Sequence, residues 1–215
     1  MQYFVVGLGN PCTEYEQTRH NTGAMVLDMF RKTAKLPEWE FDKMLDALIS
    51  RGSVSSSLLK VKGQELVVLL KPQTFMNKSG DALKKIKDFR CKITGKGKDK
   101  RTEIENLVVI HDDLDIPLGS YKLSFNKSSG GHKGVESVIR TLKTQAFARV
   151  RVGISPATSK GVIRKPKGET AVEKHILDNF SATELATLKK LSPRIAETLF
   201  CFITEGREKA MSQHN

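Results

Sequence analysis

Short apolar segments alternate with segments of helical periodicity along most of this chain. Strands are predicted where β-branched and other apolar residues run together, near 3–7, 45–50, 57–61, 65–70, 106–110, 120–125 and 148–154. Helices are predicted where apolar residues recur three or four positions apart, near 22–34, 75–90, 133–143, 170–178 and 182–207. This alternation is typical of an α/β fold with a central mixed, mostly parallel twisted sheet that is flanked by helices on both faces.

Two features of the pattern bear on the organisation of the chain. Pro193 lies inside the last helical segment, where its missing N–H predicts a kink or a break. The polar, basic segment 91–102 has both flanks in the same alternating pattern, so we expect a mobile loop rather than a linker between domains. At 24.0 kDa, residues 1–215 are expected to form a single domain.

The charge of the chain favours a polyanionic partner. Its formal net charge is +12, and the segment from Lys84 to Arg101 holds nine Lys or Arg and two Asp. A second basic cluster consists of Lys160, Arg164, Lys165 and Lys167. A single charged run is usually a solvated surface, but excess positive charge in two loops, and again near Lys127, suits nucleic acid. Neither run has the amphipathic stripe of a membrane-binding helix.

The sequence predicts neither a membrane protein nor a secreted one. No apolar run approaches the length of a bilayer span, and the first residues lack the cationic and apolar regions of a signal peptide. The three cysteines, Cys12, Cys91 and Cys201, are far apart, odd in number and without metal-ligand spacing. This cysteine usage fits a reducing cytosol, so we expect a cytoplasmic protein.

The first cluster of polar residues follows the apolar run that ends at Val6. A Gly-Leu-Gly-Asn-Pro turn places Asn10 after this run, and Tyr15, Arg19 and His20 precede the first predicted helix. Loops at the strand ends of α/β folds collect binding groups. We therefore expect a carboxamide, a phenol, a guanidinium and an imidazole close together, a composition suited to acid–base chemistry without a metal.

A second polar cluster, His111-Asp-Asp-Leu-Asp115, follows the apolar run 107–110. Because strand ends can converge, a carboxylate of this cluster is expected to reach His20. An imidazole has a reference pKa near 6.5, so a histidine oriented by a carboxylate is a usable general base, although a lone histidine is more often structural. The carboxylates would alternatively bind Mg²⁺, but adjacent residues of a strand point to opposite faces.

Two further clusters border predicted helices. Asn77 follows the strand predicted at 65–70, and it either caps the next helix or binds a substrate carbonyl or hydroxyl. Its neighbours Phe75 and Met76 would pack in the core, or against a nucleobase or an apolar side chain. The glycine-rich segment 128–134 would bring backbone N–H groups to an anion, but it lacks the spacing of an NTP-binding loop.

Four motifs, taken in order, resemble those of a known family. They are Gly7-Leu-Gly-Asn-Pro with Thr-Arg-His20-Asn, Lys71-Pro-x-Thr-Phe-Met-Asn77-x-Ser-Gly, His111-Asp112-Asp-Leu-Asp-x-Pro-x-Gly119, and Gly130-Gly-His-x-Gly134. From about residue 3 to the helix past Phe180, the chain resembles the bacterial-type peptidyl-tRNA hydrolases. This resemblance implies a monomeric α/β enzyme, without metal or cofactor, that cleaves the ester between a peptide and the 3′ end of tRNA and so recycles tRNA.

The resemblance also implies roles for individual residues. His20 would be the general base that activates water, and Asp112 would orient His20 and stabilise its charged form. The implied substrate-binding positions are Asn10, Tyr15, Met76, Asn77, His132 and Lys133. The implied tRNA-binding positions are Lys122, Lys127 and Arg151.

Two positions depart from the family pattern. Lys133 stands where the family usually has an asparagine that positions the water or stabilises the oxyanion. A lysine donates hydrogen bonds but cannot accept one. Cys12 stands where the family usually has glycine, so a turn with positive φ at this position would strain the backbone.

Two other classes of function fit parts of the sequence. Relatives with this fold act as RNA-splicing factors in chloroplasts, but a binding module would not need Asn10, His20, Asn77 and Asp112 together. A nucleotide- or nucleoside-processing enzyme would need a phosphate cradle or a base-reading pocket, which the motifs do not predict. Ester hydrolysis is therefore the function that the sequence favours.

Overall fold

The computed structural model describes residues 1–54, 65–97, 100–158 and 162–214. The strands of its main sheet are β1 (Gln2–Gly7), β2 (Glu40–Asp42), β3 (Ala47–Val54), β4 (Glu65–Pro72), β7 (Leu107–Pro117), β8 (Tyr121–Phe125) and β9 (Ala148–Ser155). They lie in the order β2-β3-β4-β1-β7-β9-β8. The strand predicted at 57–61 lies outside the described residues.

The main sheet has a parallel centre and antiparallel edges. β1 pairs in parallel with β4 and with β7, and β7 pairs in parallel with β9. The pairs β2–β3, β3–β4 and β8–β9 are antiparallel. The predicted mixed sheet is therefore confirmed, and the carboxyl ends of its central strands share one edge, where binding groups collect.

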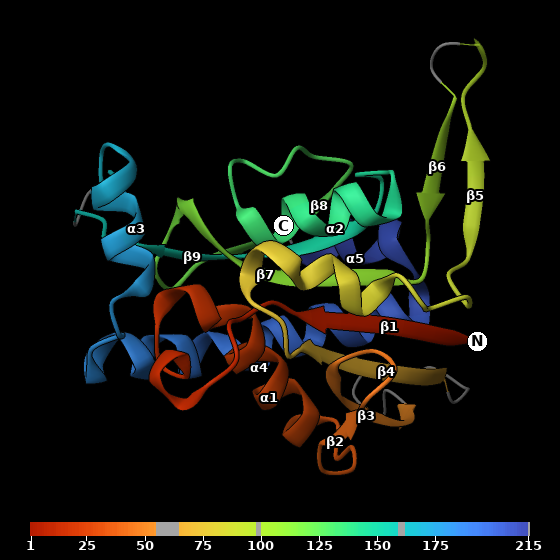
Figure 1. Ribbon diagram of the computed structural model, residues 1–215, viewed down its shortest axis with the longest axis horizontal. Coiled ribbons are helices and arrows are strands. Elements are labelled where there is room, and N and C mark those ends of the chain that lie inside the picture. The colour runs from red at the N-terminus through yellow and green to blue at the C-terminus, as the bar shows by residue number, and fades with distance from the viewer. Residues whose placement is uncertain (55–64, 98–99, 159–161, 215) are drawn as a thin grey trace.

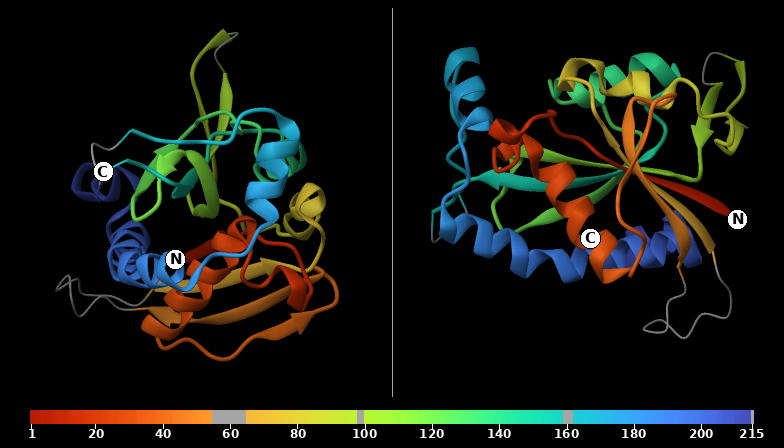
Figure 2. Two further views of the ribbon diagram at one scale, coloured as in Figure 1. Left: turned by 90° about the vertical axis from the view of Figure 1, so that its left-hand side faces the viewer. Right: turned by 60° about the horizontal axis from the view of Figure 1, so that its bottom comes forward.

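Helices cover both faces of this sheet (Figure 1 and Figure 2). The α-helices are α1 (Thr22–Thr33), α2 (Lys133–Leu142), α3 (Glu169–Leu177), α4 (Ala182–Glu205) and α5 (Arg207–His214), and the 3-10 helices are η1 (Thr13–Tyr15), η2 (Arg19–Asn21) and η3 (Met76–Leu83). In β1, Tyr3 and Val5 belong to the core under α1 and α4, whereas Phe4 and Val6 belong to the core under η3 and α2. Such central strands are apolar throughout because both of their faces are buried.

α4 runs without interruption from Ala182 to Glu205, so of the kink or break predicted at Pro193 the break is wrong. Pro193 lacks the N–H that would bond to the carbonyl oxygen of Lys189. The hydroxyl of Ser192 donates to that oxygen instead, at 2.9 Å, which satisfies the acceptor. Even with α4 included, no helix of the described ranges has both the length and the apolar character needed to cross a membrane.

The helix predicted at 75–90 is shorter and of a different type, because η3 is a 3-10 helix that ends at Leu83. Gly80 of η3 lies so close to α2 that an added Cβ would be 2.4 Å from the carbonyl oxygen of Ser137. The N–H of Gly80 also donates to Ser137 Oγ at 3.1 Å. The 3-10 geometry of η3 thus occurs where this segment packs closely against α2. Hydrophobic periodicity in the sequence does not reveal a contact of this kind.

Two segments outside the ranges predicted as strands contain strands. β7 continues past Ile110 because residues 111–113 pair with β9. The segment predicted as a loop at 91–102 contains β5 (Cys91–Thr94) and the start of β6 (Arg101–Ile104). These two strands pair with each other in a separate antiparallel sheet. β5 is mostly exposed, and Arg101 and Thr102 of β6 are exposed as well, so the cross-strand pairing leaves little hydrophobic signal.

The segment before α1 lies tightly against the carboxyl ends of β1 and β7. A Cβ on Gly7 would lie 2.5 Å from the carbonyl oxygen of Gly23, and one on Gly23 would lie 2.3 Å from the carbonyl oxygen of Ile110. The Leu8 N–H donates to the same Ile110 oxygen at 3.0 Å. Glycine at these two positions permits an approach that a side chain would prevent, and this approach brings His20 over the strand ends.

Candidate active site

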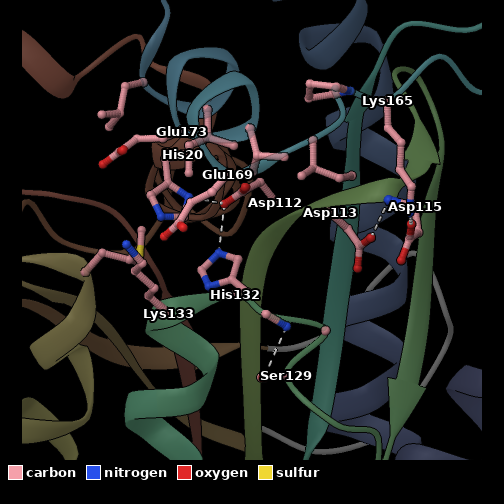
Figure 3. A pocket seen from close by; sticks show the side chains of 18 of the residues that line it. His20, Asp112, Asp113, Asp115, Ser129, His132, Lys133, Lys165, Glu169 and Glu173 are labelled. Atoms are coloured by element: carbon pink, nitrogen blue, oxygen red, sulfur yellow. Dashed lines mark hydrogen bonds and ion pairs between the residues drawn. The ribbon is translucent and has the colours of Figure 1, made fainter.

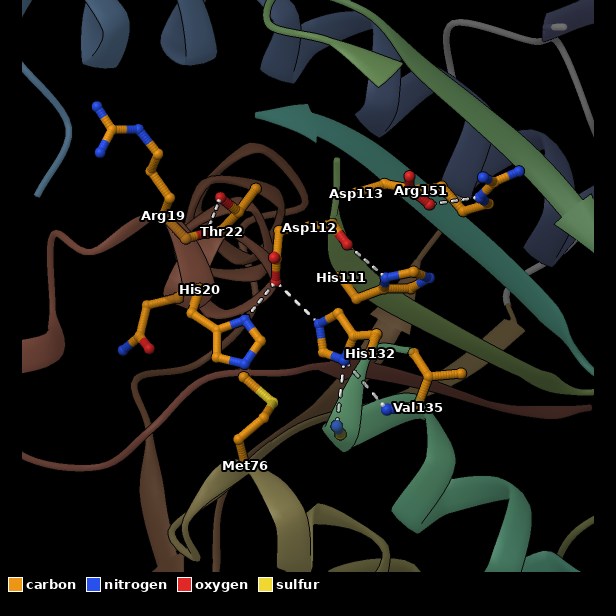
Figure 4. A network of polar contacts seen from close by, with 12 residues as sticks. Arg19, His20, Thr22, Met76, His111, Asp112, Asp113, His132, Val135 and Arg151 are labelled. Atoms are coloured by element: carbon orange, nitrogen blue, oxygen red, sulfur yellow. Dashed lines mark hydrogen bonds and ion pairs between the residues drawn. The ribbon is translucent and has the colours of Figure 1, made fainter. Parts of the chain in front are cut away.

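Asp112 joins two histidines from distant parts of the chain. His20 lies in η2, Asp112 lies in β7, and His132 caps the start of α2. The Oδ1 atom of Asp112 is 3.0 Å from His20 Nδ1 and 2.9 Å from His132 Nε2 (Figure 4). A carboxylate of the 111–115 cluster therefore does reach His20. The second histidine on the same oxygen was not predicted.

Hydrogen-bond partners determine where each imidazole carries its proton. His132 Nδ1 accepts hydrogen bonds from the N–H groups of Gly134 and Val135, at 3.1 and 3.3 Å, so its proton lies on Nε2 and points to Asp112. The carboxylate also accepts from His20, so the proton of His20 lies on Nδ1. His20 Nε2, which has no hydrogen-bond partner among the described residues, is then free to accept a proton.

Asp112 is ionised at neutral pH although it is buried. Burial alone would raise the pKa of this carboxyl, but the charges and hydrogen bonds of His20 and His132 outweigh burial and hold its pKa well below the usual range. A buried carboxylate attracts a positive charge more strongly than an exposed one does. Asp112 can therefore stabilise His20 in its protonated form.

His111 is a third histidine in contact with this group, and it is fully buried. Its Nδ1 donates to the carbonyl oxygen of Asp112 at 2.7 Å, and its ring packs edge-on against His132 with the ring centres 4.8 Å apart. Burial, together with the nearby charges of His132 and Arg149, lowers the pKa of His111 well below its usual value. His111 is therefore neutral. Its hydrogen bond supports Asp112, and its ring contact supports His132.

The stability of the fold is expected to fall in mild acid because of His111. Below about pH 6.5 the unfolded chain binds a proton at His111 that the folded protein does not bind, so the free energy of unfolding decreases by up to about 1.4 kcal/mol per pH unit. His111→Asn keeps a donor for the Asp112 carbonyl but removes this titration. Urea unfolding between about pH 7.5 and 5.5 should therefore show a shallower pH dependence in the variant. Equal dependences in the two proteins would contradict this role.

A pocket of about 750 Å³ opens beside His20 (Figure 3). Its walls come from η3, the carboxyl half of β7, the glycine-rich segment before α2, and α3. The predicted site residues that line it are Asn10, His20, Met76, Asn77, Asp112, His132, Lys133 and Arg151. The helix α3 adds Glu169, Val172, Glu173, Ile176 and Leu177. Sequence analysis missed α3 as a wall of the site, because a helical pattern does not tell where the helix docks.

Asn10 is held in place by two other segments. Its N–H donates to Asn21 Oδ1 at 2.8 Å, and its carbonyl oxygen accepts from Asn21 Nδ2 at 2.9 Å. Its side-chain Oδ1 accepts from the N–H of Met76 at 2.8 Å. This leaves the Asn10 amide NH₂, unpartnered within the described chain, to donate into the pocket. Asn21 is thus a positioning residue that sequence analysis did not identify. Its position next to His20 was the one feature of the sequence that pointed to this role.

Asn77 does not cap a helix, since Phe75 occupies the position before η3 and Asn77 is the second residue of η3. Its side chain lines the pocket and makes no hydrogen bond with the residues that the structure describes. Tyr15 is not part of the pocket lining. It contacts Phe75 edge-on, with the ring centres 6.5 Å apart, and so supports the rim of the pocket.

Arg19 faces away from the pocket, so the expectation of a guanidinium in the site is wrong. It pairs with Glu184 at 3.0 Å, and it donates to the carbonyl oxygens of His175 and Asp178 at 3.3 Å. These contacts join η2 to α3 and to the start of α4. Arg19 therefore holds the segment that carries His20.

Positive side chains surround the pocket unevenly. Arg151 lines the pocket and pairs with Asp113 at 2.7 Å, whereas Lys122 and Lys127 are exposed outside the lining. Arg149 also lines the pocket but is buried, and burial together with the nearby charge of Arg151 lowers its pKa to about 10. Sequence analysis missed Arg149. The Arg-Val-Arg spacing was a usable signal, because alternate residues of a strand share one face.

Known proteins match this chain over nearly its whole length. Residues 4–215 match the family described as "Peptidyl-tRNA hydrolase". The chain belongs to the peptidyl-tRNA hydrolase family. It is 35% identical over 214 residues to the peptidyl-tRNA hydrolase of Caldanaerobacter subterraneus subsp. tengcongensis, with 99% of each chain covered. It is also 35% identical over 216 residues to that of Aquifex aeolicus, with 98% of this chain and 95% of the relative covered.

Solved structures of peptidyl-tRNA hydrolases have the same fold. The crystal structure of the protein from Acinetobacter baumannii matches with a TM-score of 0.76 at 24% identity, over 99% of this chain and 94% of the other. The crystal structure of a peptidyl-tRNA hydrolase in complex with N-propanol matches with the same TM-score at 25% identity, over the same shares of the two chains. The resemblance seen in the sequence motifs is therefore confirmed.

The two departures from the family's motifs differ in their relation to the pocket, since Lys133 lines it and Cys12 does not. Lys133 is the first residue of α2 and is an exposed part of the pocket lining. Cys12 has a φ of 79°, in the region that favours glycine. The turn after Asn10 therefore carries the backbone strain that a non-glycine residue implies.

Three side chains of this peptidyl-tRNA hydrolase family member offer potential metal ligands. One ligand atom each from His20, Asp112 and His132 lies within 4.8 Å of the other two, a grouping that sequence spacing does not reveal. Zinc is bound by such donors, but histidine ligates through an unprotonated nitrogen. The backbone donors at His132 Nδ1 place its proton on Nε2, the nitrogen that faces Asp112. The donor set therefore fits proton transfer better than metal binding.

The other carboxylates weighed for Mg²⁺ do not converge. Asp113 pairs with Arg151 at 2.7 Å, and Asp115 pairs with Lys165 at 2.6 Å. Asp112 instead faces the two histidines, as expected for adjacent strand residues that point to opposite faces.

Proposed function

We propose that this protein hydrolyses the ester between a peptide and the 3′ end of tRNA, with His20 as the general base. Membership of the peptidyl-tRNA hydrolase family supports the reaction. One observation carries the mechanism: the ionised carboxylate of Asp112 holds the Nδ1 proton of His20, which leaves Nε2 as the proton acceptor. Carboxylates orient catalytic imidazoles in the same way in other hydrolases.

The reaction begins with attack of a water molecule on the ester carbonyl carbon. His20 Nε2 takes one proton from the water, the water oxygen bonds to the carbon, and the carbonyl oxygen becomes an oxyanion. Asp112 stabilises the imidazolium that forms. When the intermediate collapses, the bond to the ribose oxygen breaks and the proton on His20 passes to that oxygen. The free tRNA and the peptide acid then leave.

Three side chains are assigned to the substrate. The amide groups of Asn10 and Asn77 hold the peptidyl part and the ester, and the ammonium of Lys133 donates to the oxyanion. Donors that are in place before the reaction stabilise the developing charge without reorganisation. Met76 lines the pocket, and its backbone N–H also holds the side chain of Asn10. Tyr15 supports the rim of the pocket through Phe75. His132 acts through Asp112 rather than on the substrate directly.

Positive side chains near the pocket are assigned to the acceptor arm of the tRNA. Arg151 lies in the pocket wall, and Lys122 and Lys127 are exposed beyond it. Lys and Arg bind phosphates without reading sequence. We also propose that the enzyme is a cytoplasmic monomer. The three cysteines, which form no disulfide, support a reducing compartment.

Release of an N-acetyl-aminoacyl group from tRNA, measured with and without excess EDTA, tests this function. We expect equal turnover in both conditions, because the proposed steps use a histidine, a carboxylate and hydrogen-bond donors and no metal. Loss of turnover in EDTA that a divalent cation restores would contradict the metal-free mechanism. Binding of tRNA without turnover in either condition would identify an RNA-binding module instead.

A further inference from the structure

The strands β5 and β6 form a hairpin that stands apart from the rest of the fold. Its described residues, 91–97 and 100–104, are called the basic hairpin here. The two strands pair from Cys91 with Ile104 to Thr94 with Arg101, and they form a sheet separate from the seven-stranded one. Figures 1 and 2 show the hairpin projecting from the body of the molecule. Nothing in the proposed chemistry uses this projection.

The base of the basic hairpin is held by hydrogen bonds to its backbone. The N–H of Ile104 donates to the carbonyl oxygen of Ala146 at 2.8 Å, and the hydroxyl of Thr144 donates to the carbonyl oxygen of Thr102 at 2.6 Å. Just before β5, the N–H of Arg90 donates to Asn106 Oδ1 at 2.7 Å. These bonds attach both strands to the body at the foot of the hairpin.

A buried carboxylate strengthens this attachment. Glu103 accepts hydrogen bonds from Thr94 and Arg101 within the hairpin, at 2.9 and 3.1 Å, and it pairs with Arg207 of α5 at 3.3 Å. These partners outweigh burial and lower the pKa of Glu103. The hairpin is therefore a projection of defined direction rather than a free loop.

Three lysines of the basic hairpin carry exposed positive charge. Lys92, Lys96 and Lys100 are exposed, and none of them forms an ion pair with a carboxylate of the described residues. Isolated two-stranded ribbons are marginally stable, and unpaired like charges weaken them further. This arrangement costs stability in the free protein, and a polyanion bound to the lysines would offset that cost.

The position of the basic hairpin relative to the pocket indicates which part of a polyanion it would meet. α2 begins at Lys133 in the pocket wall, and its 10 residues span about 15 Å. Thr144 and Ala146, just beyond the end of α2, contact the foot of the hairpin. The exposed Arg140 and Lys143 lie along α2 between the two sites. The lysines of the hairpin thus lie at least about 15 Å from the pocket, several nucleotides along an RNA from the reacting ester.

We propose that the basic hairpin binds phosphates of a double-helical part of the tRNA, away from its 3′ end. This inference rests on the proposed function, which supplies the RNA. Lysine contacts to phosphates position a nucleic acid without reading its sequence. A lipid surface fits less well, because Ile93 is a single exposed apolar side chain among lysines. The hairpin therefore adds affinity for the whole tRNA and takes no part in the chemistry.

Binding of deacylated tRNA as a function of salt tests this proposal. The variant Lys92→Gln, Lys96→Gln, Lys100→Gln is compared with the wild type and with Lys32→Gln, Lys43→Gln, Lys190→Gln, which removes three exposed lysines elsewhere. The hairpin variant should raise Kd at least about tenfold at low salt. It should also reduce the slope of log Kd against log salt by about 2 to 3, because three fewer phosphates are contacted. The control variant should keep the wild-type slope.

Further arms of the experiment separate the possible outcomes. The hairpin variant should bind a single-stranded heptamer with the tRNA 3′ sequence as the wild type does, and it should keep the wild-type kcat on N-acetyl-aminoacyl-tRNA. Equal salt slopes for tRNA in the hairpin variant and the wild type would overturn the proposal, as would equal weakening for the heptamer. Loss of binding to phosphatidylserine vesicles without loss of tRNA binding would make a membrane the partner. A wild type that binds tRNA through the hairpin but hydrolyses no ester would contradict the proposed function alone.

Discussion

Replacing His20 by alanine is expected to lower kcat for ester hydrolysis by at least about 10²- to 10⁴-fold, the usual contribution of a positioned general base. The variant keeps the pocket, the donors and the positive side chains, so it should bind tRNA nearly as the wild type does. The measurement is release of an N-acetyl-aminoacyl group from tRNA at saturating substrate, with tRNA binding measured in parallel. No other single substitution in the site is expected to have a larger effect.

His214→Ala is the matched control, because His214 lies near the end of α5, outside the pocket lining. It should keep the wild-type kcat. Wild-type turnover in His20→Ala would show that another group activates the water. A joint loss of turnover and tRNA binding, with the fold intact by circular dichroism, would instead give His20 a role in binding the substrate.

Replacing Asp112 by asparagine is expected to lower kcat by about 10²- to 10⁴-fold, because an orienting carboxylate makes a contribution of this size to an imidazole base. The amide removes the negative charge that stabilises protonated His20. It also allows an NH₂ group to face an imidazole, which favours the tautomer with its proton on Nε2. KM should change much less than kcat, because Asp112 acts through His20 and not on the substrate. Steady-state kinetics with N-acetyl-aminoacyl-tRNA measure both effects.

Asp115→Asn tests whether any carboxylate of this cluster has the same effect. Asp115 lies three residues further along β7 and pairs with the exposed Lys165. Its loss should leave kcat unchanged, because Asp115 does not contact His20. A wild-type kcat in Asp112→Asn would remove Asp112 from the mechanism, and equal losses in the two variants would point to a general electrostatic effect.

Elements that follow from their own burial pattern were predictable from the sequence. The bounds of α1, α2 and β9 differ from the predicted ones by one residue at one end. α1 and α2 have an apolar stripe against the sheet, and every second residue of β9, from Ala148 to Ile154, is apolar and buried in the core. Local sequence is sufficient to predict a helix or strand when its buried apolar residues recur with the period of that helix or strand.

Elements that depend on one specific contact were not predictable. Ser192 satisfies the carbonyl oxygen that Pro193 leaves free, so α4 continues where a break was expected. Gly80 allows η3 to lie against α2 as a 3-10 helix. Residues 111–113 extend β7 because β9 lies beside them. In each case the element depends on a hydrogen bond or a close contact between particular residues. Such a contact does not appear in the hydrophobic periodicity of the sequence.

The sequence by itself determined which groups can react and that they follow strands of an α/β sheet. The imidazole of His20, the carboxylate of Asp112 and the amides of Asn10 and Asn77 are all present in its motifs. Only the tertiary structure decided that Asp112 lies between two histidines. It also decided that Arg19 points away from the pocket and pairs with Glu184. His20 and Asp112 are 92 positions apart. A hydrogen bond of 3.0 Å over that separation depends on how the sheet places two strand ends together, and only the packing of the whole core sets that placement.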